Sequence, residues 1–557
     1  MTYRHLLAGA AAIALSAPAF AVDENFAARA EALIEAAYPA DKPGAAVIVT
    51  EGGKVVYAGG SGMADIARGV PITADTVFRF GSITKQFAAA AVLQLAAEGK
   101  LSLDDPVAKF VPGYPEPGAK ATVRQLLNHT SGIQSYTGIP GWMGGEKVST
   151  PHTTAEMIAE FRDQPAEFQP GEKWNYNNSG YVLVGAVIEA VTGKPWHEVV
   201  RERFTAPLGL STIRYGGEEA SIPAFALGYS AADGETFAPS RKIDMSVPHA
   251  AGALVGTVGD LARWSHALHH GRIVPAPLYA EMIAPTALPG GEPVPYGYGI
   301  GQGSVRGLAM VTHSGGIFGF STDSLYIPEK DLFVAVFTNA DSGIANPGMP
   351  MLRLAAEAIG KPFAAFTAVP FDPNSMTDWN GVYRIDGGDT TRKLFVRDGQ
   401  LYTQRTGAGE SKVWPAGGNR YFYGAESLNW FELVRGPDGT ATMLMHQNGE
   451  DKAERAVWIG PVPPEAASVE LPRALLESYA GAYSSMPAPI VVALGGDGAL
   501  TLKFGNQPAT PLRALNEAEF AAIGVDARIE FNREGGKVIG LVIHQGGREL
   551  PAERTGG

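Results

Sequence analysis

A serine and a lysine stand three residues apart in the segment Phe80-Gly81-Ser82-Ile83-Thr84-Lys85. Residues at positions i and i+3 share one face of a helix, so the Lys85 amine can reach the Ser82 hydroxyl if this segment is helical. A serine needs a neighbouring base to become a nucleophile, and a lysine can be that base if burial lowers its pKa. Alone, the pattern favours an N-cap serine beside a solvated lysine, because S-x-x-K occurs by chance about once in a chain of this length.

Two further motifs contain groups that could complete such a site. Tyr176 and Asn178 lie two residues apart in a loop before a predicted helix, where a phenol can shuttle a proton and an amide can hold a carbonyl. His313-Ser314-Gly315-Gly316 lies on a predicted edge strand, where glycine lets a substrate backbone approach and N–H groups can face an oxyanion. Each motif alone also fits a polar turn or a strand entry with a surface histidine.

The elements around these motifs indicate an α+β fold. Residues 45–59 read as a hairpin and residues 324–338 as two further strands. Helices are predicted over residues 82–100, 181–192 and 351–359, because these segments are rich in Ala and Leu and end near glycine. Strands at both ends of a helical middle predict an antiparallel sheet with a helical insertion, flanked by helices.

The C-terminal third is strand-like and repeats itself weakly at an offset of about 100 residues. Residues 381–383, 398–401 and 446–449 resemble residues 481–483, 497–500 and 544–547 in the same order. Short strands at regular spacing predict two small antiparallel β-barrels. We therefore expect a signal peptide at 1–21, a catalytic domain at 22–365, and barrel domains at 373–462 and 465–557.

Composition narrows the class of protein. The 557 residues carry a formal net charge of −13, which disfavours nucleic-acid partners, and no cysteine. Residues 1–21 combine an apolar run with Ala19-Phe20-Ala21, a pattern typical of a secretory signal cleaved after Ala21. We expect a periplasmic or secreted protein with no stable membrane anchor after processing. The oligomeric state cannot be read from the sequence.

The order and spacing of the three motifs resemble the penicillin-binding-protein-like serine hydrolases, which include class C β-lactamases, D-Ala-D-Ala carboxypeptidases, D-aminopeptidases and related esterases. The resemblance covers about residues 25–360, and further family-like stretches lie at 126–132, 170–172 and 250–257. The two barrels after the catalytic domain are similar to the architecture of bacterial D-stereospecific aminopeptidases.

The resemblance implies a role for each motif residue. Ser82 is implied to be the acylated nucleophile, with Lys85 and Tyr176 as general base and acid. Asn178 matches the substrate-orienting Asn, and His313-Ser314-Gly315 matches the K-T-G strand. The N–H groups of Ser82 and Gly316 are implied to form the oxyanion hole.

One departure from the family pattern bears on the substrate. His313 replaces a lysine that is a permanent cation, and histidine is mostly uncharged near neutral pH. This favours small amide, peptide or ester substrates that lack a carboxylate at that position over an efficient β-lactamase. Within the family, H-x-G is most similar to the D-aminopeptidases, and this resemblance implies peptides with a D-residue. The alternatives are a carboxylesterase, a weak β-lactamase, or a penicillin-binding sensor that acylates without turnover.

No metal or organic cofactor is implied by these motifs. His266, His269 and His270 could bind a metal from one helix, but they precede Gly271, where partial positive charge favours a helix end. We interpret them as a helix terminus. The expected partner is a small-molecule or short-peptide substrate.

Overall fold

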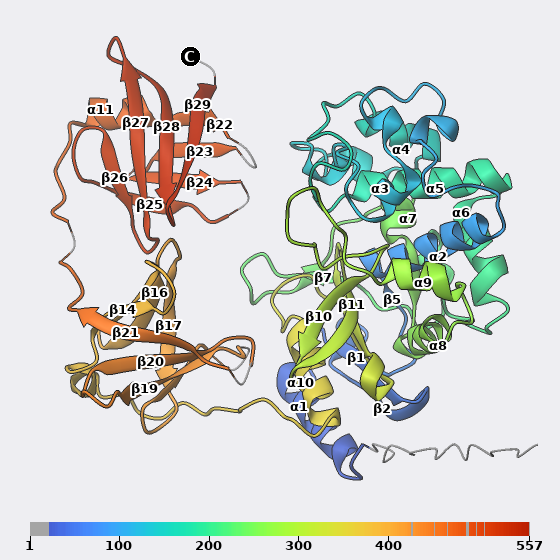
Figure 1. Ribbon diagram of the computed structural model, residues 1–557, viewed down its shortest axis with the longest axis horizontal. Helices are drawn as coiled ribbons and strands as arrows, with labels where there is room; N and C mark the ends of the chain where they lie inside the picture. Colours follow the sequence, from blue (N-terminus) through green and yellow to red (C-terminus); the bar gives the residue numbers. More distant parts are fainter. Residues whose placement is uncertain are drawn as a thin grey trace, which may run out of the picture. The chain divides into compact units, whose positions relative to one another are not determined.

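The computed structural model describes residues 22–424, 427–449, 452–464, 466–485, 489–496, 498–505 and 507–555. The segment 1–21, in which the sequence predicts a secretory signal, lies outside the described residues. The chain forms two compact units, of which the first ends at Phe363 and the second begins at Ala364. The first unit is blue to yellow in Figure 1, and the second is mainly orange to red. Within the described residues, no helix combines the length and apolar character needed to cross a membrane.

A six-stranded sheet forms the centre of the first unit, and all of its strand pairs are antiparallel. The strand order is β10-β11-β12-β13-β1-β2, so strands from both ends of the unit meet at the β13–β1 pair. The predicted α+β fold is therefore confirmed. The strands are β1 (Ala45–Glu51), β2 (Lys54–Ser61), β10 (Gly301–Val305), β11 (Leu308–Ile317), β12 (Phe320–Ile327) and β13 (Leu332–Thr338).

The two central strands are buried on both faces. Successive side chains of a strand point to opposite faces, so β1 divides its apolar residues between two cores. Val47 and Val49 pack with Val334 in the core under α1 (Phe26–Ala37) and α10 (Gly348–Ala358), whereas Ile48 and Ala335 join the larger core on the helical side. The sheet is thus held between two helical layers.

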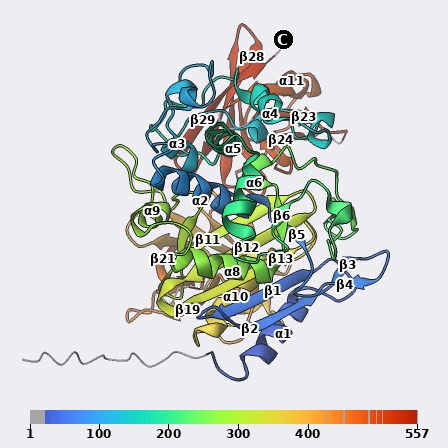
Figure 2. The same cartoon turned by 90° about the vertical axis from the view of Figure 1, so that its right-hand side faces the viewer.

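The larger helical layer covers the face of the sheet that carries the predicted site. Its central helix, α2, is apolar on almost all sides and almost completely buried, which is the expected pattern for a helix inside a core. Helix α8 packs against β13 and β1, as Figure 2 shows. The main helices of this layer are α2 (Thr84–Ala97), α3 (Val123–Leu127), α4 (Thr154–Phe161), α5 (Asn178–Thr192), α6 (Trp196–Val200), α7 (His249–Gly252), α8 (Val258–His269) and α9 (Ala276–Met282).

The prediction that the His313 strand lies at a sheet edge is wrong for its first half. Strand β10 pairs with Leu308–Thr312 of β11, and its register ends at the Gly301–Thr312 pair. From His313 onward β11 continues beyond β10 while still pairing with β12. No strand was predicted at β10, because four of its five residues are polar or glycine.

The second unit contains two closed antiparallel barrels of eight strands each. The first comprises β14 (Gly381–Ile385), β15 (Thr391–Arg397), β16 (Gln400–Arg405), β17 (Glu410–Pro415), β18 (Arg420–Phe422), β19 (Trp430–Arg435), β20 (Ala441–His446) and β21 (Glu454–Gly460). The second comprises β22 (Gly481–Ser484), β23 (Ile490–Leu494), β24 (Leu500–Phe504), β25 (Thr510–Ala514), β26 (Glu519–Ala522), β27 (Ala527–Glu534), β28 (Lys537–Gln545) and β29 (Arg548–Thr555).

The sequence repeat occupies equivalent positions in the two barrels. Tyr383 and Tyr483 lie on the first strand of each barrel, both are buried, and each hydroxyl donates to the carbonyl four residues earlier, that of Trp379 and Tyr479 respectively. A shared internal hydrogen bond at the same position supports one ancestral design for both barrels.

The barrels contact each other through different parts of their surfaces. The turn between β16 and β17 of the first barrel pairs with the turn between β26 and β27 of the second. Glu410 N–H donates to the Gly524 carbonyl at 2.8 Å, and Asp526 N–H donates to the Ala408 carbonyl at 3.0 Å.

Candidate active site

Ser82 lies on a single 3₁₀ turn, Gly81–Ile83, that leads directly into α2. The helix was predicted to begin at Ser82, but it begins at Thr84, because Gly81 enters the turn with a left-handed φ of 54°. Ser82 and Lys85 still share one face, because the 3₁₀ turn continues directly into the helix. The Lys85 Nζ lies 3.0 Å from the Ser82 Oγ.

Lys85 is completely buried, and its amine has three polar neighbours. Besides Ser82, these are the Asn178 Oδ1 and the Ala251 carbonyl oxygen, each at 2.9 Å. Burial lowers the pKa of Lys85 well below its ordinary value, because desolvation disfavours the charged amine. The aromatic rings of Tyr176 and Tyr181 lie 4.8 and 5.3 Å from the Nζ and offset part of that cost.

The proton inventory of this cluster suits a general base. A neutral lysine amine has two N–H donors and one lone pair. The Ala251 carbonyl can only accept, and the Asn178 amide presents its oxygen because its nitrogen faces the Thr137 hydroxyl. Two acceptors take the two N–H groups, so the lone pair is left for the Ser82 hydroxyl proton.

Tyr176 completes the group of predicted catalytic residues on the other side of the serine. Burial raises the pKa of Tyr176, although a hydrogen bond with Ser82 acts in the opposite direction. The phenol therefore keeps its proton at neutral pH and stands beside both the nucleophile and the amine. Ser82, Lys85, Tyr176 and Asn178 thus converge, although they come from two separate segments of the chain.

His129 positions the Tyr176 loop, a role the sequence reasoning did not assign. Its Nδ1 accepts the Asn177 N–H at 3.1 Å, its carbonyl accepts the Asn175 N–H at 3.1 Å, and its ring centroid lies 4.4 Å from that of Tyr176. Burial, followed by the charges of Lys85 and His313, lowers the pKa of His129 well below its ordinary value. His129 is therefore a neutral support rather than a second cation.

His313 lies beneath the site rather than in its opening. Its Nδ1 donates to the Ser314 carbonyl at 2.6 Å, so the Nε2 must accept, and it lies 2.8 Å from the Tyr296 hydroxyl. Burial and then the Lys85 charge lower the pKa of His313 to about 3. Both nitrogens are occupied within the protein, and the imidazole stays uncharged at working pH.

Strand β11 approaches the nucleophile's backbone very closely. A Cβ added to Gly315 would lie 2.0 Å from the Phe80 carbonyl oxygen, and one added to Gly81 would lie 3.0 Å from the Gly316 nitrogen. The Thr322 hydroxyl fixes this approach by donating to the same Phe80 carbonyl at 2.9 Å. The two glycines bring the Gly316 N–H beside the Ser82 turn, as an oxyanion hole requires.

A cavity of about 370 Å³ opens at Ser82. Asn178 and Gly316 line it, whereas Lys85, Tyr176, His313 and Gly315 do not. Asp341 is the one charged side chain among the lining residues, and no sequence motif predicted it. The lining residues are Gly81, Ser82, Tyr136, Thr137, Met143, Asn178, Ile243, Pro248, Ala251, Gly252, Gly316, Ile317, Phe318, Phe320, Ser321 and Asp341.

An antiparallel sheet covered by helices, with a serine–lysine pair at the start of a buried helix, defines a class of serine hydrolases that work through an acyl-enzyme. The family model Beta-lactamase matches residues 30–357. The chain belongs to this family.

Known relatives agree with this assignment. Penicillin-binding protein 4* of Bacillus subtilis is 25% identical over 73% of this chain and 93% of its own length. The D-aminopeptidase of Gluconobacter oxydans is 27% identical over 64% of this chain, and the match spans 65% of that protein. A D-stereospecific amidohydrolase from Streptomyces sp. is 32% identical with a TM-score of 0.52, over 60% of this chain and 99% of its own. The chain is thus a β-lactamase-like serine hydrolase with aminopeptidase and amidase homologues.

Replacing Lys85 tests whether the amine is the base. Lys85→Ala should lower kcat/KM by about 10²- to 10⁴-fold, the usual contribution of a general base. In the wild type, kcat/KM should fall as pH drops through the lowered pKa of Lys85, because the protonated amine has no lone pair. Lys85→Arg is the matched control, since it keeps a cation that cannot deprotonate. Substantial activity in that variant would contradict the base role.

The close approach of β11 predicts that Gly315 tolerates no side chain. Gly315→Ala should lower the free energy of unfolding by about 1–3 kcal/mol and kcat/KM by at least about tenfold, because the backbone of Phe80 must move. Gly301→Ala on the neighbouring strand is the control, since its added Cβ meets no atom closer than 3.4 Å. Chemical denaturation and initial rates measure both effects, and equal behaviour of the two variants would refute the argument.

Proposed function

We propose that this protein hydrolyses small amides or short peptides that carry a free α-amine, including those with a D-residue at the N-terminus. Ser82 attacks the carbonyl carbon while Lys85 takes its proton, and the leaving amine receives a proton from the Lys85–Tyr176 pair. Water then adds to the acyl-enzyme, and the Ser82–acyl bond breaks to release the acid. The two relatives named for D-stereospecific chemistry support the D-residue.

The observation that carries the proposed substrate class is the charge of the cavity. Asp341 accepts from the Gly319 N–H at 2.7 Å and the Ser230 hydroxyl at 2.8 Å through one oxygen, and from the Ser342 hydroxyl at 3.0 Å through the other. All these donors are neutral, and the second oxygen keeps a free lone pair. A substrate ammonium can use it, whereas a substrate carboxylate would be repelled.

The groups that could instead bind a carboxylate are engaged or uncharged. His313 has both nitrogens bonded within the protein and a pKa lowered to about 3. Arg241 stacks over the Phe318 ring at 5.2 Å and donates to the carbonyls of Met143 and Gly144. This favours an aminopeptidase or amidase over the alternatives of a β-lactamase or a penicillin-binding sensor. A carboxylesterase is the second candidate, because the lining residues other than Asp341 are uncharged and also suit an ester.

The sequence pattern of residues 1–21 supports export, and we place the activity in the periplasm or the medium. Mass spectrometry of the exported protein should give the mass of a chain that begins at Val22. A mass that includes residues 1–21 would contradict export by this route.

Turnover of matched substrates tests the proposed function. We expect steady hydrolysis of D-alanine p-nitroanilide, slower hydrolysis of its L-isomer, and little hydrolysis of nitrocefin. Asp341→Asn should lower kcat/KM for the free-amine anilide by about three- to tenfold, the scale of a partly exposed ion pair, and leave the N-acetylated anilide unchanged.

Ser82→Ala provides the baseline and should abolish every activity. A single burst followed by a stable adduct would indicate the sensor instead. Preference for the N-acetylated anilide in the wild type would overturn the proposed substrate class, and equal losses on both anilides in Asp341→Asn would overturn the role of that carboxylate.

A further inference from the structure

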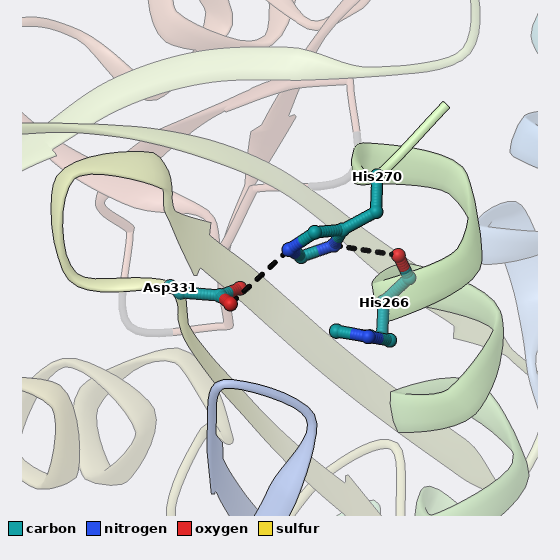
Figure 3. A group of neighbouring side chains, drawn as sticks. All are labelled: His266, His270 and Asp331. Atoms are coloured by element: carbon teal, nitrogen blue, oxygen red, sulfur yellow. Dashed lines mark hydrogen bonds and ion pairs between the residues drawn. The ribbon is translucent and has the colours of Figure 1, made fainter. Parts of the chain in front are cut away.

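Three side chains on the helical face of the sheet form a cluster that does not overlap the Ser82 cavity. His266 and His270 are one turn apart at the end of α8, and Asp331 lies in the turn between β12 and β13 (Figure 3). One ligand atom from each residue lies within 4.8 Å of the other two. His269, the third histidine at the end of this helix, does not belong to the cluster. Its Nδ1 lies 2.7 Å from the Tyr279 hydroxyl oxygen, and its ring stacks on Tyr326.

Both ring nitrogens of His270 face oxygen atoms that can only accept hydrogen bonds, but a neutral imidazole has only one N–H. Its Nδ1 lies 2.8 Å from the His266 carbonyl oxygen, which can only accept, so this nitrogen must carry the hydrogen. Its Nε2 lies 3.1 Å from the Asp331 Oδ2, which is also an acceptor. A neutral imidazole has one N–H, so the Nε2 lone pair would face a carboxylate lone pair. Either a second proton or a metal ion must lie between them.

The surroundings orient His270 and Asp331 as metal ligands and leave His266 free to join them. The carbonyl bond to Nδ1 fixes the tautomer that leaves Nε2 free, as in most metal-binding histidines. The Tyr326 hydroxyl donates to the Asp331 Oδ1 at 2.9 Å and leaves Oδ2 directed at His270. The ring nitrogens of His266 have no hydrogen-bond or ion-pair partner among the described residues. The His266 ring centroid lies 4.0 Å from that of His270.

The neighbouring hairpin leaves room for the His266 imidazole. The Gly52 N–H donates to the Asp331 carbonyl at 2.9 Å, which ties the β1–β2 turn to the β12–β13 turn. A Cβ on Gly53 would lie 2.8 Å from the His266 ring, so only glycine leaves this space. The end of α8 and two turns distant in sequence therefore converge on one point.

We propose that His266, His270 and Asp331 bind a divalent transition-metal ion of the zinc type. Two imidazoles and one carboxylate are typical ligands of Zn²⁺, whereas Ca²⁺ and Mg²⁺ prefer oxygen ligands alone. Tetrahedral Zn²⁺ with bonds of about 2.0–2.1 Å separates its ligand atoms by about 3.3 Å, close to the observed 3.1 Å between His270 and Asp331. Rotation of the His266 side chain brings in the third ligand, and water takes the fourth position.

The bound ion would connect the end of α8 to the β12–β13 turn. No residue of the cluster lines the Ser82 cavity, so the ion stabilises the fold and takes no part in acyl transfer. The inference is therefore independent of the proposed function.

Metal titration of the full-length, tag-free protein tests the proposal. After chelator treatment, calorimetry with ZnCl₂ at pH 7.5 should show one equivalent bound with a Kd on the order of micromolar or tighter. Excess Zn²⁺ should raise the Tm by about 2–4 °C. His266→Ala and the near-isosteric Asp331→Asn should each weaken binding at least about tenfold and remove the Tm rise.

His152→Ala, a histidine outside the cluster, is the matched control and should bind Zn²⁺ like the wild type. Circular dichroism checks that each variant is folded. If His266→Ala does not fold, Asp331→Asn alone tests the proposal. The Ser82 activity of the folded variants should be unchanged. Absence of saturable binding, unchanged binding in both variants, or a cluster that responds to pH between 5 and 8 but not to Zn²⁺ would each overturn the proposal.

Discussion

The completely buried amine of Lys85 is the constraint on which the catalytic unit depends. An amine in this position is tolerated because two carbonyl oxygens, from Ala251 and Asn178, occupy its N–H groups. These acceptors come from segments that follow Lys85 by 166 and 93 residues. The helical layer must therefore assemble completely before the Lys85 amine has the hydrogen bonds and the lowered pKa of a general base. The same desolvation that would destabilise a charge lowers the pKa of the amine, so burial and function have one physical cause.

The support around this amine is built from neutral polar groups. His129 and His313 are both buried near Lys85, and the pKa of each is lowered by desolvation first and by the Lys85 charge second. Tyr296 and the Ser314 carbonyl occupy the two nitrogens of His313. The Asn177 N–H donates to the Nδ1 of His129, whose buried Nε2 has no hydrogen-bond partner among the described residues. Because these neighbours stay uncharged, Lys85 gains and loses its proton without a competing cation, and substrate recognition falls to the cavity, where Asp341 carries the charge.

The sequence predicted the architecture well and the site in part. Short apolar runs bounded by turn residues at β1 and β13, the apolar α2 and the glycine-ended helices indicated the α+β fold, because local composition reflects burial directly. The i and i+3 spacing of Ser82 and Lys85 is also local. By contrast, Asp341 and the Ala251 carbonyl reach the site only through tertiary contacts, and a backbone oxygen has no signal in a sequence. The pairing of Asp331 with His270, across 61 residues, was invisible for the same reason.

The contact between the two barrels has a consequence for how the pair evolved. The first barrel contributes its β16–β17 turn and the second its β26–β27 turn, so the joint is heterologous rather than symmetric. A duplicated gene begins with identical copies, yet each copy here presents a different surface to its neighbour. Selection on the joint therefore acted on separate residues in each copy. Internal hydrogen bonds such as those of Tyr383 and Tyr483 lie apart from this joint and are the same in both copies.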